Sequence, residues 1–251
     1  MKNVIPKSEF IYKLCRYYTN LFNGENNSNM LTNGEVVFLK NSAHHFKVVF
    51  DVGANLGNWT EEILKLNKNI DIHCFEPSIS TFKKLNSKKF PKNVHLNNIA
   101  LGAMNTKSEF YVYKDSPSLN SFYKRGGINT FTKPFEIKKE LVNIETLENY
   151  CKKNKIEMID LVKIDVEGYE FEVLKGMGAM LKEGKIKRIQ FEYGGCNIDS
   201  RILLKDFFTL LLPLGYDFYK ILFNHLEHWK TYDQRVENFQ YQNWLTVLNR
   251  S

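Results

Sequence analysis

Four acidic residues, each at the end of a short apolar run, are the side chains of this sequence best suited to chemistry. They are Asp51, Glu76, Asp165 and Glu192. In an open α/β sheet, ligands bind outside the carboxyl ends of the strands, where side chains from neighbouring strands meet. We therefore expect these four carboxylates to surround one crevice, because helix capping is a poor explanation for all four.

Asp51 introduces a glycine turn, in which Gly53 and Gly57 precede a predicted helix. Gly53 lets the backbone turn sharply and lets a ligand approach the main chain. A dinucleotide site has the spacing G-x-G-x-x-G, whereas Asn55 stands here in place of the middle glycine. Asp51 would repel a pyrophosphate but can accept a hydrogen bond from an ammonium or hydroxyl group. The motif therefore favours S-adenosylmethionine over NAD, with a simple tight turn as the alternative.

Glu76 ends the next strand-like run, 19 residues after Gly57. This position suits a carboxylate that accepts both hydroxyls of a ribose. Pro77 follows where the first turn of a helix tolerates proline, so capping of that helix is the other interpretation of Glu76. Asn98 ends a third run and could bring an amide to the edge of an adenine, although Asn is also common in turns.

The segment LVKIDVEGYE at 161–170 ends a predicted buried strand with acids and a glycine. Period-two alternation places Lys163, Asp165 and Glu167 on one face if the strand extends that far. A lysine beside acids suits a polar site, because unpaired charges are costly to bury. Glu192 ends the following strand, and we expect it to point into the same crevice.

Three of these acids are candidate general bases: Asp165, Glu167 and Glu192. His44 and His45 are weaker candidates, because they precede the first strand and are expected at the surface, away from the crevice. Clustered acids can also hold Mg²⁺ or Ca²⁺. Nothing in the spacing requires a metal, and we predict none.

Alternating strand and helix patterns surround these motifs. The predicted strands are 47–51, 70–75, 94–101, 109–113, 135–143, 158–164, 186–193, 216–223 and 244–248. The predicted helices are 8–22, 58–66, 78–85, 146–153, 169–181 and 200–212. Such alternation predicts an α/β fold: a Rossmann-like, mostly parallel sheet with one antiparallel edge strand and helices on both faces.

Two segments depart from the alternation. Residues 1–40 are predicted to form an N-terminal extension of helix and loop, followed by one domain over 41–251. Within that domain, residues 108–143 interrupt the rhythm and are predicted to form an insertion on the substrate side.

The composition fits a globular protein with a sizeable core, at 43% hydrophobic residues. No apolar run approaches the roughly 18 to 20 residues needed to span a bilayer, and the N-terminus lacks a secretory signal, so we expect a cytoplasmic chain without a membrane span. The four cysteines are spread along the chain, which predicts scattered, buried, reduced thiols. A net charge of +7 favours acidic partners, although much of the excess lies in lysine groups that are expected to be solvated.

The motifs together resemble the FkbM family of methyltransferases. The matching segments are FDVGANLGNWT (50–60), FEPS (75–78), NIALG (98–102), LVKIDVEGYEFEVLKGM (161–177) and QFEY (190–193), with weaker matches in TNGE (32–35), LNSFYKR (119–125), TLENY (146–150) and VENFQYQNWL (236–245). The resemblance implies a class I methyltransferase sheet of seven strands, one of them antiparallel, and S-adenosyl-L-methionine as cofactor. It also implies methylation of hydroxyl oxygens on sugars, glycans or polyketide-type products, as in polysaccharide biosynthesis.

The resemblance and the motifs together define the expected site. The predicted cofactor-binding residues are Asp51, Gly53, Ala54, Asn55, Gly57, Glu76, Pro77, Asn98, Ala100 and Asp165. The predicted catalytic residues are Asp165, Glu167, Glu192 and Lys163.

The expected reaction is in-line transfer of a methyl group to a sugar, glycan or small-molecule hydroxyl, in which alignment of the reactants is the main task of the protein. One alternative is a nucleic acid methyltransferase, which the positive charge would suit. We consider nucleic acid an unlikely partner, because the Asn/Asp-Pro-Pro-aromatic run typical of enzymes that act on base amines is absent. A second alternative is a protein that binds S-adenosylmethionine without catalysis.

Overall fold

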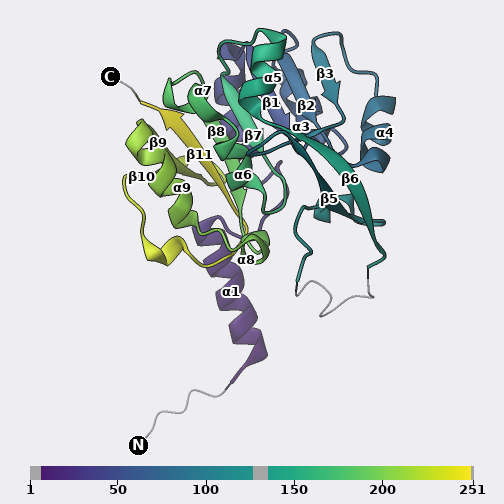
Figure 1. The fold of residues 1–251 in the computed structure, drawn as a ribbon. Coiled ribbons are helices and arrows are strands. Elements are labelled where there is room, and N and C mark those ends of the chain that lie inside the picture. The colour runs from purple at the N-terminus through teal and green to yellow at the C-terminus, as the bar shows by residue number, and fades with distance from the viewer. Residues whose placement is uncertain (1–6, 127–134, 250–251) are drawn as a thin grey trace, which may run out of the picture.

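The computed structural model describes residues 7–126 and 135–249 of the chain, and Figure 1 shows its elements. The strands of the larger sheet are β1 (Val48–Val52), β2 (Asp71–Phe75), β3 (Val94–Asn97), β7 (Leu161–Ile164), β8 (Arg188–Tyr193), β9 (Tyr216–Ile221), β10 (Leu226–Trp229) and β11 (Gln242–Leu248). A smaller sheet contains β4 (Ala100–Leu101), β5 (Thr106–Tyr113) and β6 (Ile137–Glu145). The helices are α1 (Glu9–Asn23), α2 (Glu35–Ser42), α3 (Asn58–Leu66), α4 (Ile79–Ser87), α5 (Leu147–Asn154), α6 (Glu170–Lys175), α7 (Gly178–Lys182), α8 (Cys196–Ser200) and α9 (Leu204–Leu211).

The larger sheet has the strand order β10-β9-β11-β8-β7-β1-β2-β3. The pairs from β3 through β2, β1 and β7 to β8 are all parallel. β11 is antiparallel to both of its neighbours, and β10 forms an antiparallel edge. The predicted class, a mostly parallel Rossmann-like sheet with helices, is confirmed; β11 adds an antiparallel strand inside the sheet, where the prediction had one only at the edge.

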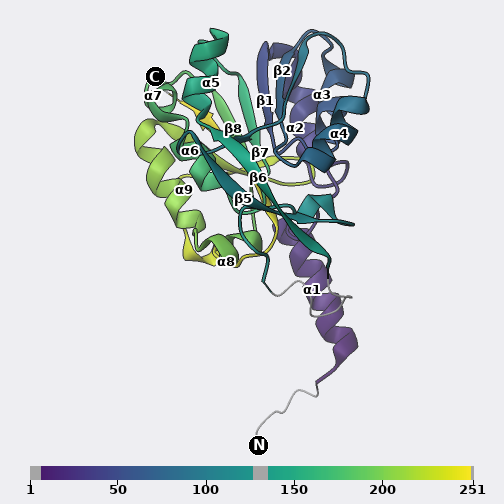
Figure 2. The same ribbon diagram turned by 45° about the vertical axis from the view of Figure 1, so that its right-hand side comes forward.

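Helices cover both faces of this sheet (Figures 1 and 2). One core cluster packs side chains of α5, α6, α7 and α9 against Phe50, Val162 and Phe191. The other packs α2, α3 and α4 against Val49 and Leu161. Because successive strand residues point to opposite faces, Asp51 and Lys163 share the face that α2 and α3 cover.

The described residues within 98–126 and 135–145 lie outside the larger sheet. The predicted strand 94–101 is split, since β3 pairs with β2 whereas β4 joins the smaller sheet beside β6. β5 and β6 pair antiparallel over their whole length. Part of the predicted insertion, residues 127–134, lies outside the described residues. The domain boundaries at 40 and at 108–143 stay predictions.

Two predicted helices are interrupted where local geometry requires it. The helix predicted over 169–181 breaks into α6 and α7 at Gly178, whose left-handed φ of 52° cannot continue a right-handed helix. The helix predicted over 200–212 begins only at Leu204, after the separate α8. Strand β10 and helix α2 were not predicted.

The N-terminal helix α1 extends away from the rest of the molecule in both views (Figures 1 and 2). The side chain of Ser8 accepts a hydrogen bond from the backbone N–H of Ile11 at its start, and Gly24 ends it in a left-handed conformation. None of its residues is buried. Within 7–126 and 135–249, no helix has both the length and the apolar character to cross a bilayer.

The four cysteines are free, as predicted. Cys74, Cys151 and Cys196 are buried, but Cys15 is exposed, so the expectation of buried thiols is wrong for that residue. The reason is its place on α1, none of whose residues is buried.

Candidate active site

A cavity of about 790 Å³ opens at the carboxyl ends of β1, β2, β7 and β8. Its volume falls in the range of roughly 300 to 1,000 Å³ that small-molecule sites occupy. The predicted residues that line it are Gly53, Ala54, Asn55, Glu76, Pro77, Ala100, Lys163, Asp165, Glu167 and Glu192. Asp51, Gly57 and Asn98 are outside the lining, and each supports a residue that borders the cavity.

The glycine turn passes very close to the end of β7. Gly53 has a φ of 83°, and a Cβ there would lie 1.9 Å from the backbone oxygen of Asp165. Only glycine fits this conformation and this contact. Gly57, with a φ of 78°, begins α3, and a Cβ there would lie 2.7 Å from Leu85 and 2.9 Å from Phe90. Both glycines are therefore explained by close packing. Gly53 packs against the backbone of Asp165, and Gly57 packs against Leu85 and Phe90.

Asp51 lies beneath this turn rather than in the cavity. Its side chain is fully buried, and its Oδ2 accepts a hydrogen bond of 2.7 Å from the hydroxyl of Thr60 on α3. Its Oδ1 lies 3.4 Å from the ammonium of Lys163. In this position Asp51 ties the turn to α3 and β7, and direct contact between Asp51 and a cofactor stays a prediction.

Glu76 ends β2 with its carboxylate at the cavity. Its two oxygens accept hydrogen bonds from the backbone N–H groups of Asn55 (3.0 Å) and Ser78 (2.9 Å). Burial raises the pKa of Glu76 to about 7 despite these hydrogen bonds. Asn98 donates to the backbone oxygens of Glu76 (2.9 Å) and Pro77 (3.0 Å), so it fixes this segment from behind.

Lys163 connects two of the predicted acids. β1 and β7 pair with Asp51 opposite Lys163, and the ammonium also lies 3.1 Å from Oδ2 of Asp165. Burial alone would lower the pKa of Lys163, but the carboxylates of Asp165 and Asp51 raise it above its ordinary value. Lys163 is therefore a buried cation that neutralises the acids, not a proton acceptor.

Glu167 faces an arginine that comes from a distant segment. Arg125 donates from Nη1 to the carboxylate of Glu167, and its Nε lies 3.4 Å from Asp199. Burial raises the pKa of Glu167 to about 8, and the guanidinium of Arg125 opposes this rise. The backbone of Glu167 is left-handed, with a φ of 55°, and its carbonyl accepts a 2.7 Å hydrogen bond from Ser121. Arg125 and Ser121 thus hold this acid in an uncommon conformation.

Glu192 projects from β8 toward the same acids. Burial raises the pKa of Glu192 well above its ordinary value, and the neighbouring carboxylates of Asp165 and Glu167 raise it further. Its environment therefore favours the protonated form more than that of an ordinary glutamate does. Ligand atoms of Glu167, Glu192 and Cys196 all lie within 4.8 Å of one another, a spacing compatible with a cation.

His44 and His45 lie on a short 3-10 turn that precedes β1, at the opposite end of the strand from the cavity. Both are exposed, as expected from the sequence, and their rings are 3.8 Å apart. Neither histidine lines the cavity, so the acids are the candidate proton acceptors there.

Several residues of the cavity wall were not predicted. Glu35 is buried at the start of α2 and accepts hydrogen bonds from Asn33, Gln190 and Asn243. Other unpredicted lining residues are Trp59, Phe110, Phe122, Arg125, Tyr169, Cys196 and Tyr241. The weaker sequence matches at 32–35, 119–125 and 236–245 contain Glu35, Phe122, Arg125 and Tyr241, so these segments carried a usable signal.

The model of the methyltransferase FkbM domain matches residues 51–218, which include the glycine turn and all four strand-end acids. The chain belongs to the FkbM methyltransferase family. The FkbM methyltransferases use S-adenosylmethionine, which is therefore the cofactor to test against this cavity.

One curated relative of this FkbM chain is the 2-O-methyltransferase NoeI of Sinorhizobium fredii. The two sequences are 24% identical over 140 residues, which cover 51% of this chain and 56% of the relative. The chain thus matches little more than half of that relative's length.

The solved structures that align with this chain include methyltransferases. The plantazolicin methyltransferase BpumL, in complex with SAH and a substrate analogue, aligns over 96% of this chain and 91% of its own, at 9% identity and a TM-score of 0.46. The METTL16 methyltransferase domain aligns over 86% of this chain and 67% of its own, at 8% identity and a TM-score of 0.48. Likeness at these scores does not bear on what the FkbM chain binds.

The residues of the cavity fit S-adenosylmethionine. Oδ1 of Asn55 and Nε1 of Trp59 are buried in the lining, and neither has a hydrogen-bond partner among the described residues. Gly53 and Ala54 line the same wall, and Glu76 presents a carboxylate suited to a ribose diol. The wall therefore offers both unused polar atoms and space to a polar nucleoside.

Proposed function

We propose that the protein is an S-adenosylmethionine-dependent O-methyltransferase that acts on a hydroxyl of a sugar, glycan or polyketide-like acceptor. The observation that carries this proposal is the group of strand-end carboxyls in one cavity, in which Asp165 is paired with Lys163 and lies beside Glu167 and Glu192. Membership of the FkbM family supports the cofactor, and the 2-O-methyltransferase name of one relative supports an oxygen acceptor.

The residues around the glycine turn would hold the cofactor. Gly53 and Asn55 would contact it through the main chain and an amide, and Glu76 would accept the hydroxyls of its ribose. When bound, S-adenosylmethionine supplies an electrophilic methyl group on sulfur. Asp51 and Asn98 would act by fixing the turn and the end of β2.

The acids would prepare the acceptor hydroxyl. Asp165 is the general base of this proposal, because its side chain is 38% exposed at the cavity and its charge is balanced by Lys163. Burial raises the pKa of Glu192, and in its protonated form this residue would donate a hydrogen bond and so orient the acceptor oxygen or Asp165. Two carboxyls with different environments thereby take different roles, as in other acid–base sites.

The acceptor would lie against the insertion. Phe110 and Phe122 line the cavity from that segment, and the ring of Phe122 lies 4.3 Å from that of Tyr169. Aromatic faces of this kind can stack on a sugar ring, while Arg125 adds a hydrogen-bond donor at the same wall. We therefore propose residues 108–143 as the segment that selects the acceptor.

The test measures methyl transfer from labelled S-adenosylmethionine to a panel of sugars, glycans and small hydroxyl compounds. Once an acceptor is found, Asp165→Asn should lower kcat by roughly 10²- to 10⁴-fold, the usual contribution of a general base. Saturable binding of S-adenosylhomocysteine by this variant would show that it is folded, which separates chemistry from folding. Asp217→Asn, on β9 and outside the cavity wall, is the matched control and should retain activity.

Two outcomes would contradict the proposal. Methylation of RNA with no transfer to any hydroxyl compound, accompanied by binding that weakens steeply with salt, would favour a nucleic acid methyltransferase. Cofactor binding without transfer to any acceptor class would favour a non-catalytic binding protein.

A further inference from the structure

A second polar cluster lies at the opposite end of the sheet from the cavity. Asp71 begins β2, and His73 follows two residues later on the same strand. His95, on the neighbouring edge strand β3, is the register partner of His73. β2 ends at Phe75, next to Glu76 and the cavity, so this cluster is separate from the proposed active site.

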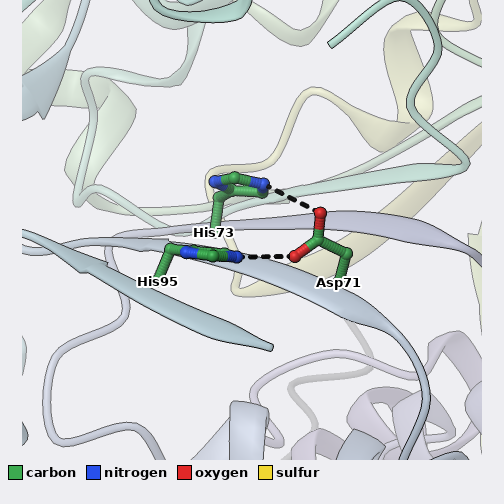
Figure 3. Close-up of side chains that lie close together, drawn as sticks. All are labelled: Asp71, His73 and His95. Atoms are coloured by element: carbon green, nitrogen blue, oxygen red, sulfur yellow. Dashed lines mark hydrogen bonds and ion pairs between the residues drawn. The ribbon is translucent and has the colours of Figure 1, made fainter. Parts of the chain in front are cut away.

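Both histidines present a ring nitrogen to the same carboxylate (Figure 3). Nε2 of His95 lies 2.7 Å from Oδ1 of Asp71, and Nε2 of His73 lies 3.5 Å from Oδ2. The two rings are stacked with centroids 4.6 Å apart. One ligand atom from each of the three residues lies within 4.8 Å of the other two.

The hydrogen bonds behind His73 determine which of its nitrogens carries hydrogen. The amide of Asn97 donates to the backbone oxygens of Cys74 and His95, so its own oxygen is the free acceptor. The hydroxyl of Tyr150 donates its single hydrogen to that oxygen. It must therefore accept at its other contact, 2.8 Å from Nδ1 of His73, which makes Nδ1 the protonated nitrogen.

Nε2 of His73 is consequently left with a lone pair directed at a carboxylate. The side chain of His73 is only 5% exposed. Among the described residues none forms a hydrogen bond with this nitrogen. A buried acceptor that faces an anionic acceptor is unfavourable unless a cation lies between them.

We propose that Asp71, His73 and His95 bind a divalent transition-metal ion of the Zn²⁺ type. Two imidazoles and one carboxylate are ligands that such ions prefer, whereas Mg²⁺ and Ca²⁺ prefer oxygen alone. The hydrogen bond from Nδ1 to Tyr150 is the second contact that metal-binding histidines usually make. His95 is half exposed, which leaves an entry path and a position for water.

This ion would stabilise the fold and would take no part in methyl transfer. It would join the edge strand β3 to β2, and Tyr150 would extend the connection to α5. An ion that binds only the folded protein stabilises it in proportion to the logarithm of its concentration over Kd. The site therefore predicts a protein whose melting temperature depends on Zn²⁺.

The test uses the full-length, untagged protein after treatment with a chelator. Addition of Zn²⁺ at a hundredfold excess over its Kd should raise Tm by about 5–10 °C for a domain of this size. His95→Ala and Asp71→Asn, which change partly exposed side chains, should each weaken Zn²⁺ binding at least tenfold and remove the shift. Tyr150→Phe keeps the ring but removes the hydroxyl, and should weaken binding by about 10- to 100-fold.

Two control variants distinguish this site from other places where Zn²⁺ could bind. His44→Ala removes one of the adjacent surface histidines, and Cys196→Ala removes the thiol of the cluster inside the cavity. Both should retain the Zn²⁺-dependent shift in Tm. A shift that is absent from the unaltered protein, survives His95→Ala, or disappears in either control would overturn the proposal.

Discussion

The carboxyl of Glu76 gives the proposed cofactor site a pH dependence that can be measured directly. Burial raises the pKa of Glu76 from 4.5 to about 7. A ribose offers two hydroxyl donors, and only the ionised carboxylate has an acceptor oxygen available for each. We therefore expect cofactor binding to require the ionised form and to become tighter as the pH rises through 7.

The size of the effect follows from the fraction of ionised Glu76. With a pKa of about 7, roughly one-tenth of the carboxyl is ionised at pH 6 and roughly nine-tenths at pH 8. Apparent affinity scales with the binding-competent fraction, so S-adenosylhomocysteine should bind about tenfold more tightly at pH 8 than at pH 6. The stability of the unliganded protein should show the opposite trend. A raised pKa stabilises the fold below about pH 4.5, and this contribution is lost as the pH rises through 7.

Isothermal titration calorimetry with S-adenosylhomocysteine across this pH range tests the reasoning. Glu76→Gln should bind more weakly at pH 8 and show no increase in affinity with pH. Glu170→Gln is a matched control. Burial also raises the pKa of Glu170 to about 7, and it accepts backbone hydrogen bonds from Val166 and Gly168, but it does not line the cavity. A pH dependence that persists in Glu76→Gln, or vanishes in Glu170→Gln, would refute the assignment.

Three further predictions concern residues that shape the site and the core. Gly53→Ala should lower Tm and abolish measurable binding of S-adenosylhomocysteine in calorimetry, because the new Cβ would overlap the backbone oxygen of Asp165. Unchanged binding would contradict the close approach of the Gly53 turn to Asp165. Lys163→Met should destabilise the protein by about 3–5 kcal/mol in urea unfolding, since it leaves Asp51 buried without its cation, and the additional change Asp51→Asn should restore part of this loss. Phe218→Ala should cost about 3–5 kcal/mol in the same assay, because its ring is fully buried; a loss below about 1 kcal/mol would show that the core there repacks freely.

The sequence was most informative where one local pattern determines one element. The helix predicted over 58–66 matches α3 residue for residue, and β1 was displaced by a single position, because a buried strand, a glycine turn and an amphipathic helix follow one another. The lining of the cavity by Glu76, Asp165 and Glu192 also follows from the rule that parallel strands end at one edge of the sheet.

The sequence could not show which strand-end side chains reach the cavity. Asp51 lies one residue before the end of its strand, and its pairing opposite Lys163 and its hydrogen bond to Thr60 place it beneath the turn. Asn98 likewise was expected at the adenine but supports the backbone of Glu76. Such outcomes depend on register and on the face of the sheet, which are set by contacts between distant segments.

The unpredicted residues of the site have the same origin. Arg125 follows an irregular segment without periodicity, and only the folded chain brings it to Glu167. Helix α2 is eight residues long with a weak apolar pattern, and Glu35 at its start is paired with Gln190 and Asn243 from β8 and β11. Two of the hydrogen-bond partners of Glu35 lie more than 150 positions away in the sequence, so the residues around Glu35 do not indicate that it is buried.

Whether the cavity binds a sulfonium nucleoside is tested by calorimetry, which compares the binding of S-adenosylhomocysteine and of NAD to the purified protein. We expect saturable binding of S-adenosylhomocysteine that is weakened by Glu76→Gln, and no binding of NAD. Absence of binding by S-adenosylhomocysteine, or equal affinity for the two nucleotides, would contradict the view that strand-end carboxylates form a site for a sulfonium nucleoside.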